Sequence, residues 1–398
     1  MVLFRWRALI LFLLVLLVAL TGCEGLRVNA NSVAGGSGPG APTAPTTPGS
    51  AQTPRFAFWY SPWDPTITPA AIKPADVVIG IAPSIVPTVH ALGKRALQYQ
   101  TYYQSEPNSL LLNSTQDLTN VGFEINQQFV INIFGNPPNS YVLCPNSVVL
   151  HKRVQQYVQQ SLSSGYDGLF LDNTFFDPPA HLVCDGSHAH VDPSAEGGRA
   201  YITLVSEVRQ IIKAHNPEAI LMTNPGNPLW LDRIATGSPT LWDVSDYVLW
   251  EGWGYTAATQ HDQWNNYIPL SYQMVATHPD RVAQLVMLSY VKSVTEARFA
   301  FAAARFFGFT WTGNINNSFG NYLNSIPFGL GEPIGSLPPQ APVLQRMFEH
   351  GEVFVNTSAT VQSVTVPAGN LYLGETNQAL AVPTVVDLQP RVAAIVIF

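Results

Sequence analysis

Short apolar runs alternate with amphipathic stretches along most of the chain. Three longer stretches, 148–165, 197–217 and 293–308, repeat their apolar residues at helical spacing and end at or near glycine or proline. Strands that alternate with helices predict parallel β/α units, and eight strands fit one (β/α)8 TIM barrel over residues 56–340. The expected strands are 56–61, 76–82, 96–103, 167–173, 219–224, 246–252, 283–290 and 308–313.

The alternation of strands and helices is least regular in the first part of the expected barrel. No convincing helix separates the first two runs, and a loop-rich stretch, 104–147, follows the third. The tail differs again, because 351–374 and 385–398 alternate apolar and polar residues between turn signals. Residues 341–398 are therefore expected to form a small, sandwich-like antiparallel β domain.

The N-terminus has the pattern of an export signal. Two arginines precede an apolar run, 8–20, that closes on "LTGC". This predicts a lipoprotein signal peptide over 1–22, a lipidated Cys23 and a flexible Pro/Gly/Ser/Thr linker to residue 55. The protein would then be exported and held in the cell envelope by its lipid alone, and Glu24 slightly favours the outer membrane. The alternative is a plain secretory signal with an incidental cysteine.

Composition and charge limit the kinds of molecule that this protein can bind. Only 11% of the residues are charged, the formal net charge is -7, and no Lys/Arg cluster follows the signal segment. This composition argues against a nucleic-acid partner, since phosphate neutralisation needs such clusters. Two further cysteines, Cys144 and Cys184, lie in turn-rich segments, and an exported protein permits a disulfide between them. Two separate thiols are the alternative.

Polar residues stand where the expected strands end. In a TIM barrel the active site lies at the carboxyl ends of the strands, so these residues are the first candidates. Asp64 lies just beyond the first strand. The others are Asp172, Asn173, Thr223, Asn224, Glu251, Tyr290, Thr312 and Asn314. Among these residues Asp64, Asn173, Asn224 and Tyr290 are expected to bind substrate.

Two carboxylates on separate strands suit cleavage of a glycosidic bond, where one attacks or stabilises the anomeric centre and the other protonates the leaving oxygen. Glu251, between Trp250 and Trp253, has the apolar surroundings that raise the pKa of an acid. Asp172 has Asn173 and turn amides beside it, which would keep it ionised. Aromatic side chains could supply flat surfaces for sugar rings, although each alone is more often core: Trp59, Trp63, Trp253, Tyr255 and Trp311.

The motif "YDGLFLDN" (166–173) resembles one found in bacterial glycoside hydrolases, namely the hypothetical glycosyl hydrolase families related to the polygalactosaminidases and, more distantly, the α-galactosidases. The resemblance covers about 56–398 and includes "GEVFVNTS" (351–358), which looks like the small β domain attached to such barrels. It implies that Asp172 is the nucleophile and Glu251 the acid/base. Hydrolysis by such a pair of carboxyl groups needs no cofactor. The segment 175–198 is longer than expected there.

Each of these assignments has a plainer reading. Asp172 could cap a turn, Glu251 could form a salt bridge or bind a sugar hydroxyl, and Asn224 could satisfy loop backbone groups. Asp167 is expected to be structural, as a turn former at the start of its strand. The leading hypothesis is a monomeric, retaining glycoside hydrolase acting on an oligo- or polysaccharide. The alternative is a non-catalytic carbohydrate-binding surface lipoprotein.

A third hypothesis places a metal in the segment "CDGSHAHVD" (184–192). His and carboxylate side chains can share an ion, and a hydrolase of another polar substrate could use one there. The spacing matches no strong motif, so a polar, solvated loop is the expectation and no metal is assigned. The residues concerned are Asp185, His188, His190 and Asp192.

Overall fold

The computed structural model describes part of the chain. The described residues are 57–59, 69–72, 75–102, 104–105, 109, 111–130, 141–174, 179–231, 237, 239–257, 260–313, 322 and 325–398. The expected signal peptide, Cys23 and linker lie outside them, as do Asp64, Trp63 and Asn314. No helix among the described residues combines the length and the apolar character that crossing a membrane would need.

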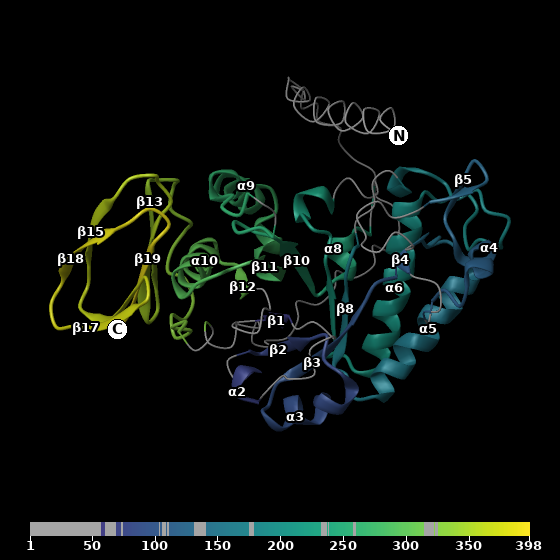
Figure 1. Ribbon diagram of the computed structural model, residues 1–398, viewed down its shortest axis with the longest axis horizontal. Helices are drawn as coiled ribbons and strands as arrows, with labels where there is room; N and C mark the ends of the chain where they lie inside the picture. Colours follow the sequence, from purple (N-terminus) through teal and green to yellow (C-terminus); the bar gives the residue numbers. More distant parts are fainter. Residues whose placement is uncertain are drawn as a thin grey trace, which may run out of the picture. The chain divides into compact units, whose positions relative to one another are not determined.

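An eight-stranded parallel sheet forms the centre of the fold (Figure 1). Its order is β1-β2-β3-β8-β9-β10-β11-β12, and the two end strands, β1 and β12, contact each other, so the sheet is curled. Every expected strand is confirmed, and the α/β class with it. The strands are β1 (Ala57–Trp59), β2 (Val77–Ile79), β3 (Arg95–Gln100), β8 (Gly168–Leu171), β9 (Ile220–Thr223), β10 (Tyr247–Glu251), β11 (Leu285–Ser289) and β12 (Thr310–Gly313).

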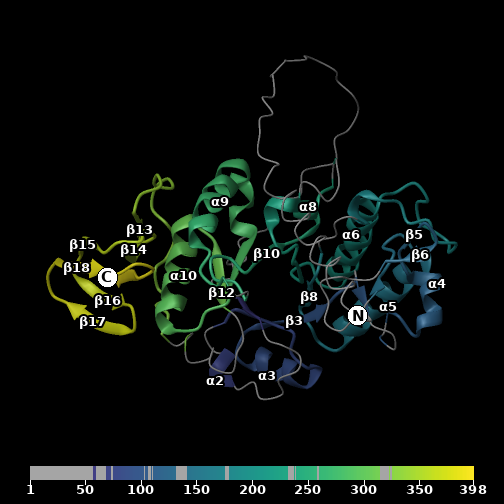
Figure 2. The same ribbon diagram turned by 45° about the horizontal axis from the view of Figure 1, so that its top comes forward.

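Helices cover the outside of this sheet, with α5 and α6 beside each other (Figure 1) and α9 and α10 near β10 to β12 (Figure 2). The three expected helices are confirmed to within two residues. Local sequence sets their ends: the Ser147 hydroxyl accepts a hydrogen bond from the Leu150 N–H at the start of α5. The α-helices are α2 (Pro69–Ile72), α3 (Val86–Ala91), α4 (Leu118–Val121), α5 (Val148–Ser163), α6 (Gly197–His215), α8 (Leu241–Val244), α9 (Trp264–Thr277) and α10 (Val294–Phe307). The short 3-10 helices are η1 (Pro83–Ile85), η2 (Thr115–Asp117), η3 (Pro179–His181), η4 (Pro228–Trp230) and η5 (Pro279–Gln284).

The strands are apolar on both faces, as buried parallel strands are. One set of side chains packs together inside the curl of the sheet, and the alternate set packs against the helices in the larger core. The inner set is Val77, Ile79, Leu97, Phe170, Ile220, Met222, Leu249, Val286 and Leu288.

Gly168, the first residue of β8, is required by the close approach of β9. A Cβ atom at this position would lie 1.9 Å from the carbonyl oxygen of Ile220, and the backbone φ is +150°. Any other residue would push the two strands apart. The glycine of the "DGLFLDN" motif is therefore needed to pair the strand that carries Asp172 with the strand that carries Asn224.

The connection between β3 and β8 contains more structure than its loop-rich sequence indicates. Two antiparallel pairs lie in it, β4 with β7 and β5 with β6, together with η2 and α4. Figures 1 and 2 show β5 and α4 at one end of the α5 and α6 pair. The strands are β4 (Gln104–Ser105), β5 (Glu124–Ile125), β6 (Gln128–Phe129) and β7 (Tyr141–Val142).

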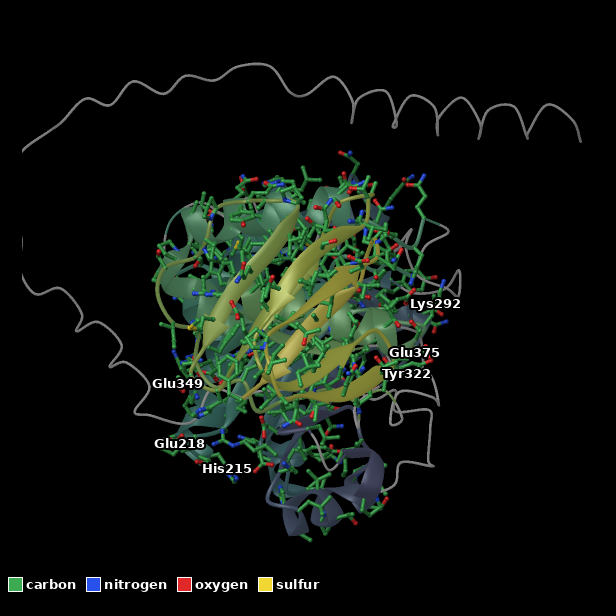
Figure 3. All side chains as sticks on the ribbon, turned by 90° about the vertical axis from the view of Figure 1, so that its left-hand side faces the viewer. His215, Glu218, Lys292, Tyr322, Glu349 and Glu375 are labelled. Atoms are coloured by element: carbon green, nitrogen blue, oxygen red, sulfur yellow. The ribbon has the colours of Figure 1, made fainter. Side chains whose placement is uncertain are left out.

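The C-terminal segment forms two antiparallel sheets, as expected. Five strands pair in the order β13-β14-β19-β16-β17, and β15 pairs with β18. Figure 3 shows the C-terminal strands face on. The buried Arg298 of α10 donates to the carbonyl oxygens of Gly374 and Thr376, both at 2.8 Å, and so joins β16 and β17 to a helix that covers the central sheet. The strands are β13 (Val343–Phe348), β14 (Gly351–Asn356), β15 (Gln362–Val366), β16 (Gly369–Leu373), β17 (Thr376–Leu380), β18 (Thr384–Leu388) and β19 (Ala393–Ile397).

Candidate active site at the carboxyl ends of the strands

The alternation of the central strands decides which polar side chains meet. In five of these strands the last inward apolar residue is followed, two positions later, by a polar residue of the same face. Leu97, Phe170, Met222, Leu249 and Leu288 all belong to the inner cluster. The polar residues two positions beyond them are Tyr99, Asp172, Asn224, Glu251 and Tyr290.

Asn224 joins the two carboxylates. Its side-chain amide donates to Oδ1 of Asp172 at 2.6 Å and to Oε2 of Glu251 at 2.7 Å. Those two carboxylate oxygens therefore lie no more than about 5.3 Å apart, the sum of the two distances. The acids that stand 79 positions apart in the sequence thus share one hydrogen-bond donor.

A tyrosine holds the second oxygen of each carboxylate. The Tyr99 hydroxyl donates to Oδ2 of Asp172 at 2.5 Å, and the Tyr290 hydroxyl donates to Oε1 of Glu251. Burial, with the nearby negative charges, raises the pKa of both tyrosines well above the ordinary value. Both phenols therefore stay protonated and act as neutral donors.

Backbone hydrogen bonds between neighbouring strands fix these positions. The Asp172 N–H donates to the carbonyl of Gln100 at 2.8 Å, and the Asn224 N–H donates to the carbonyl of Leu171 at 2.8 Å. The Glu251 N–H likewise donates to the carbonyl of Gly226 at 2.9 Å. The site is thus carried by the sheet itself, which orients side chains more rigidly than loops do.

Burial shifts the titration of Asp172 in the opposite direction to the sequence prediction. The side chain is 7% exposed, and this desolvation, followed by the charge of Glu251, raises its pKa to about 6. Hydrogen bonds from Tyr99 and Asn224 act against that rise. The backbone N–H of Asn173 also lowers the pKa, as expected from the sequence, but burial outweighs all of these hydrogen bonds. The carboxylate still ionises near neutral pH.

Asn173 and Thr174 follow the carboxylate at the start of the next turn. Asn173 is exposed, has a left-handed backbone with φ of 52°, and its amide donates weakly to Asp172 at 3.3 Å. The backbone N–H of Thr174 donates to the carbonyl of Asn224 at 2.9 Å. The tight turn therefore supports the carboxylate and keeps Asn173 where a ligand could reach it.

The prediction that Trp253 and Trp311 bind sugar is wrong. Trp253 and Trp311 are both 0% exposed, so neither ring offers a face to a ligand. Trp253 donates to Ser271 at 3.0 Å and packs edge-on against Trp264, while Trp311 lies on the outer face of β12 against Phe301. Both face the helices. The side chain of Trp59, like Asp64, lies outside the described residues.

The predicted disulfide is also wrong. Cys144 and Cys184 are buried free thiols. Their sulfur atoms lie close to ring nitrogens of His188 and His190. The expectation of a polar, solvated loop fails for these two histidines, because each has a ring nitrogen that is shielded from solvent.

Tyr99 is a site residue that the search for polar residues at the ends of the expected strands missed. It precedes the end of β3 by one residue, so a search for polar residues immediately after each strand passes over it. Its position two residues after the inward-facing Leu97 is the signal that could have found it. Asn224 and Tyr290 were expected to bind substrate. In the structure their polar groups are directed at the two carboxylates instead.

Comparison with known proteins shows the fold. The chain is similar to a family GH13_31 enzyme (11% identity, 86% of this chain and 98% of that chain, TM-score 0.54). It is also similar to the alpha-glucosyl transfer enzyme XgtA (11% identity, 87% and 100%, TM-score 0.53). A third structure is the glycoside hydrolase domain of PelA from Pseudomonas aeruginosa (16% identity, 67% and 96%, TM-score 0.46). No protein-family model and no curated protein matches the chain. At these identities the likeness shows a glycoside hydrolase fold alone.

Proposed function

We propose that this protein is a glycoside hydrolase in which Asp172 and Glu251 carry out the cleavage. The observation that supports the proposal most is the single amide of Asn224 donating to both carboxylates. Such a bridge holds two acids together at the carboxyl end of a parallel sheet, where enzymes of this fold place their chemistry. The polygalactosaminidase-related resemblance of "YDGLFLDN" points to the same two residues.

The proposed reaction is retaining. Asp172 attacks the anomeric carbon while the glycosidic C–O bond breaks, and Glu251 gives its proton to the departing oxygen. In the second step Glu251 takes a proton from water, the resulting hydroxide attacks the anomeric carbon, and the bond to Asp172 breaks. The upper bound of about 5.3 Å on one pair of carboxylate oxygens is shorter than the separation of about 6.5–9.5 Å typical of inverting enzymes, which favours retention.

The uncharged hydrogen-bond donors around the two carboxylates suit their proposed roles as nucleophile and acid/base. A hydrogen bond from a neutral phenol or amide orients a carboxylate without adding a positive charge that would weaken it as a nucleophile or base. Asp172, with its pKa near 6, would be charged above that pH and therefore ready to attack. The experiment below tests this role directly.

A panel of polysaccharides assayed for newly released reducing ends tests the proposal. The wild-type protein should act on at least one of them, and Asp172→Asn and Glu251→Gln should each abolish or nearly abolish release while sugar binding persists. Asp280→Asn is the matched control, because that carboxylate is exposed, with 72% of its side chain accessible. Full activity in Asp172→Asn would refute the assignment.

The same panel distinguishes the alternative of a carbohydrate-binding protein. Binding of a polysaccharide by calorimetry, with no release of reducing ends at any pH from 4 to 9, would identify a binding protein. For the active substrate, nuclear magnetic resonance of the first product gives the stereochemistry. Initial release of the inverted anomer would contradict the covalent role of Asp172.

We also propose that the enzyme is exported and tethered by lipid on Cys23. The apolar segment and the "LTGC" sequence support this reading, and the Pro-rich linker would hold the catalytic domain away from the bilayer. Mass spectrometry of the processed N-terminus should find diacylglycerol and acyl chains on Cys23. A soluble, unmodified product of the wild-type gene would contradict it.

A further inference from the structure

Two cysteines and two histidines converge in the described part of the chain, away from the carboxylate site. They are Cys144, Cys184, His188 and His190, and one potential ligand atom from each lies within 4.8 Å of all the others. The sulfur of Cys184 is 3.9 Å from Nε2 of His188. The two imidazole rings lie 4.6 Å apart, centroid to centroid. We propose that this cluster binds one structural zinc ion.

The donor set matches the proposal in chemistry. Two thiolates and two imidazoles form one of the usual tetrahedral environments of zinc, and soft sulfur ligands disfavour magnesium or calcium. A tetrahedron with Zn–S bonds near 2.3 Å and Zn–N bonds near 2.0 Å has edges of about 3.3–3.8 Å. The observed spacing approaches these edges, so closing on an ion needs side-chain adjustments of roughly 1 Å or less.

Buried nitrogen atoms without a partner are a second, independent observation. Nδ1 of His188 and Nε2 of His190 are shielded from solvent and make no hydrogen bond to the described residues. An unsatisfied buried polar atom is destabilising, and an ion that accepts a lone pair from such a nitrogen would remove much of that penalty. His188 approaches Cys184 through its other nitrogen, Nε2, so on that ring the ion would bind Nε2 and would fix the ring without satisfying Nδ1. A disulfide between the cysteines would give neither ring a partner.

Gly186 makes room for the cluster. A Cβ atom on this residue would lie 2.6 Å from Cε1 and 2.8 Å from Nδ1 of His188. Those distances are shorter than any normal contact, so another residue would displace the imidazole ring. The turn between Cys184 and His188 is thus shaped to bring the ring back toward the sulfur.

The backbone around the cluster is already ordered by hydrogen bonds. The N–H of Val148 donates to Ala189 at 3.0 Å, and the N–H of Val191 donates to Asn146 at 2.8 Å, on either side of His190. The N–H of Cys144 in turn donates to Val121 at 2.7 Å. This preformed arrangement reduces the entropy lost when the ligands close on an ion.

The place of the cluster in the fold indicates what the ion does. Cys184, His188 and His190 belong to the long connection between β8, which ends beside Asp172, and α6. Cys144 belongs to the segment that leads into α5. The ion would fasten this connection to the segment that leads into α5, and the Asp residues near the histidines have other partners. Asp185 instead accepts from the N–H of Asn126 at 2.7 Å.

Elemental analysis of the purified full chain, prepared without chelators, tests the proposal. One zinc per chain is expected, and it should fall at least about 10-fold in Cys144→Ser, Cys184→Ser and His190→Gln, because a four-ligand site rarely survives the loss of one ligand. His181→Gln is the matched control, since this exposed histidine lies in the same connection outside the cluster. It should retain the zinc.

Cobalt substitution keeps the test independent of how the variants fold. The wild-type protein loaded with Co²⁺ should show thiolate-to-metal charge transfer and the intense visible bands of tetrahedral coordination. Removing the zinc with a chelator should lower the melting temperature by at least about 5 °C, and added zinc should restore it. Gly186→Ala should weaken zinc binding although it removes no ligand.

Two results would overturn the proposal. One is the lack of any stoichiometric transition metal, both as purified and after zinc is added under reducing conditions. The other is a wild-type protein lighter by two hydrogens, with Cys144 and Cys184 joined in one peptide after digestion, which would establish a disulfide. The sugar-release assay is separate from both measurements, so failure here leaves the proposed hydrolase activity untouched.

Discussion

The two ends of strand β8 carry carboxylates in contrasting surroundings. At the amino end, Oδ2 of Asp167 accepts from the N–H of Ala96 at 2.7 Å and contacts Nε2 of His90 at 2.8 Å. At the carboxyl end, Asp172 is bound by the neutral groups of Tyr99 and Asn224. One carboxylate joins strands and a surface histidine, and the other is held beside a second acid.

Strand β10 repeats the contrast. Asp246, before its amino end, accepts from Arg209 at 2.8 Å and from the N–H of Leu221 at 2.9 Å, and lies 3.1 Å from the ammonium of Lys213. Glu251, at its carboxyl end, has only Tyr290 and the amide of Asn224 as side-chain partners in the described part of the chain. The amino-end acid is neutralised by two cations, whereas the carboxyl-end acid is not.

This difference separates stability from chemistry. Among the described residues no Lys or Arg pairs with Asp172 or Glu251, and two acids that share a donor repel each other. Natural proteins keep such arrangements where function needs them. The amino ends of the strands therefore stabilise the sheet, and the carboxyl ends carry the groups that we propose for catalysis.

The largest expected difference between the two ends is in turnover. Asp172→Asn should lower kcat by at least about 10⁴-fold, because an amide cannot attack the anomeric carbon. Asp167→Asn should change kcat by less than about 3-fold and instead destabilise the fold by about 1–2 kcal/mol, through the weakened bond to Ala96. Initial rates and urea unfolding of both proteins measure this. An equal loss of kcat in Asp172→Asn and Asp167→Asn would contradict the functional difference between the two ends of the strand.

Removing the shared donor should have the next largest effect. Asn224→Ala leaves both carboxylates without their common partner, so their spacing is lost and kcat should fall about 100-fold. Asn227→Ala is the matched control, since that loop amide accepts from the N–H of Leu229 at 3.0 Å and contacts neither carboxylate among the described residues. An Asn224→Ala enzyme with unchanged kcat would show that the bridge has no role in turnover.

The smallest effect should come from Tyr99→Phe. The hydroxyl of Tyr99 lowers the pKa of Asp172, so its loss should raise that pKa above about 6. The acidic limb of the pH–rate profile should then move to higher pH by up to about one unit. Tyr166→Phe also deletes one buried hydrogen bond, at 2.5 Å to the carbonyl of Ile81, and should leave that limb in place. An acidic limb that stays fixed in Tyr99→Phe would separate it from Asp172.

Much of the sheet was predictable because each strand is a short apolar run bounded by turn residues. The periodicity also predicted α5, α6 and α10, whose apolar faces pack on the sheet. The strand-end rule found Asp172 and Glu251 for the same reason, since the acids follow strands that are buried on both faces. These features depend on local sequence, which is what periodicity reports.

The remaining features depend on distances that no local pattern contains. Whether Trp311 faces a ligand or a helix follows from the inner or outer face of β12, and its register with β11 puts it opposite the outward Met287. The approach of Cys144 to Cys184 and the histidines likewise depends on how two connections pack. The pKa of Asp172 follows from burial by the whole fold, which outweighs its neighbours in sequence.

The pH dependence of unfolding tests the contrast between the two ends most directly, and it needs no substrate. The folded-state pKa of Asp172, about 6, lies above the unfolded value of about 3.9, so its contribution is fully present below pH 4 and is lost as pH rises through 6. Asp172→Asn has no carboxyl group to ionise, so its stability should not fall in this way as the pH rises. The account predicts that Asp172→Asn is more stable than wild type by up to about 3 kcal/mol at pH 8 and gains nothing at pH 3, whereas Asp246→Asn is less stable at pH 8. A loss of stability at pH 8 in both variants would contradict it.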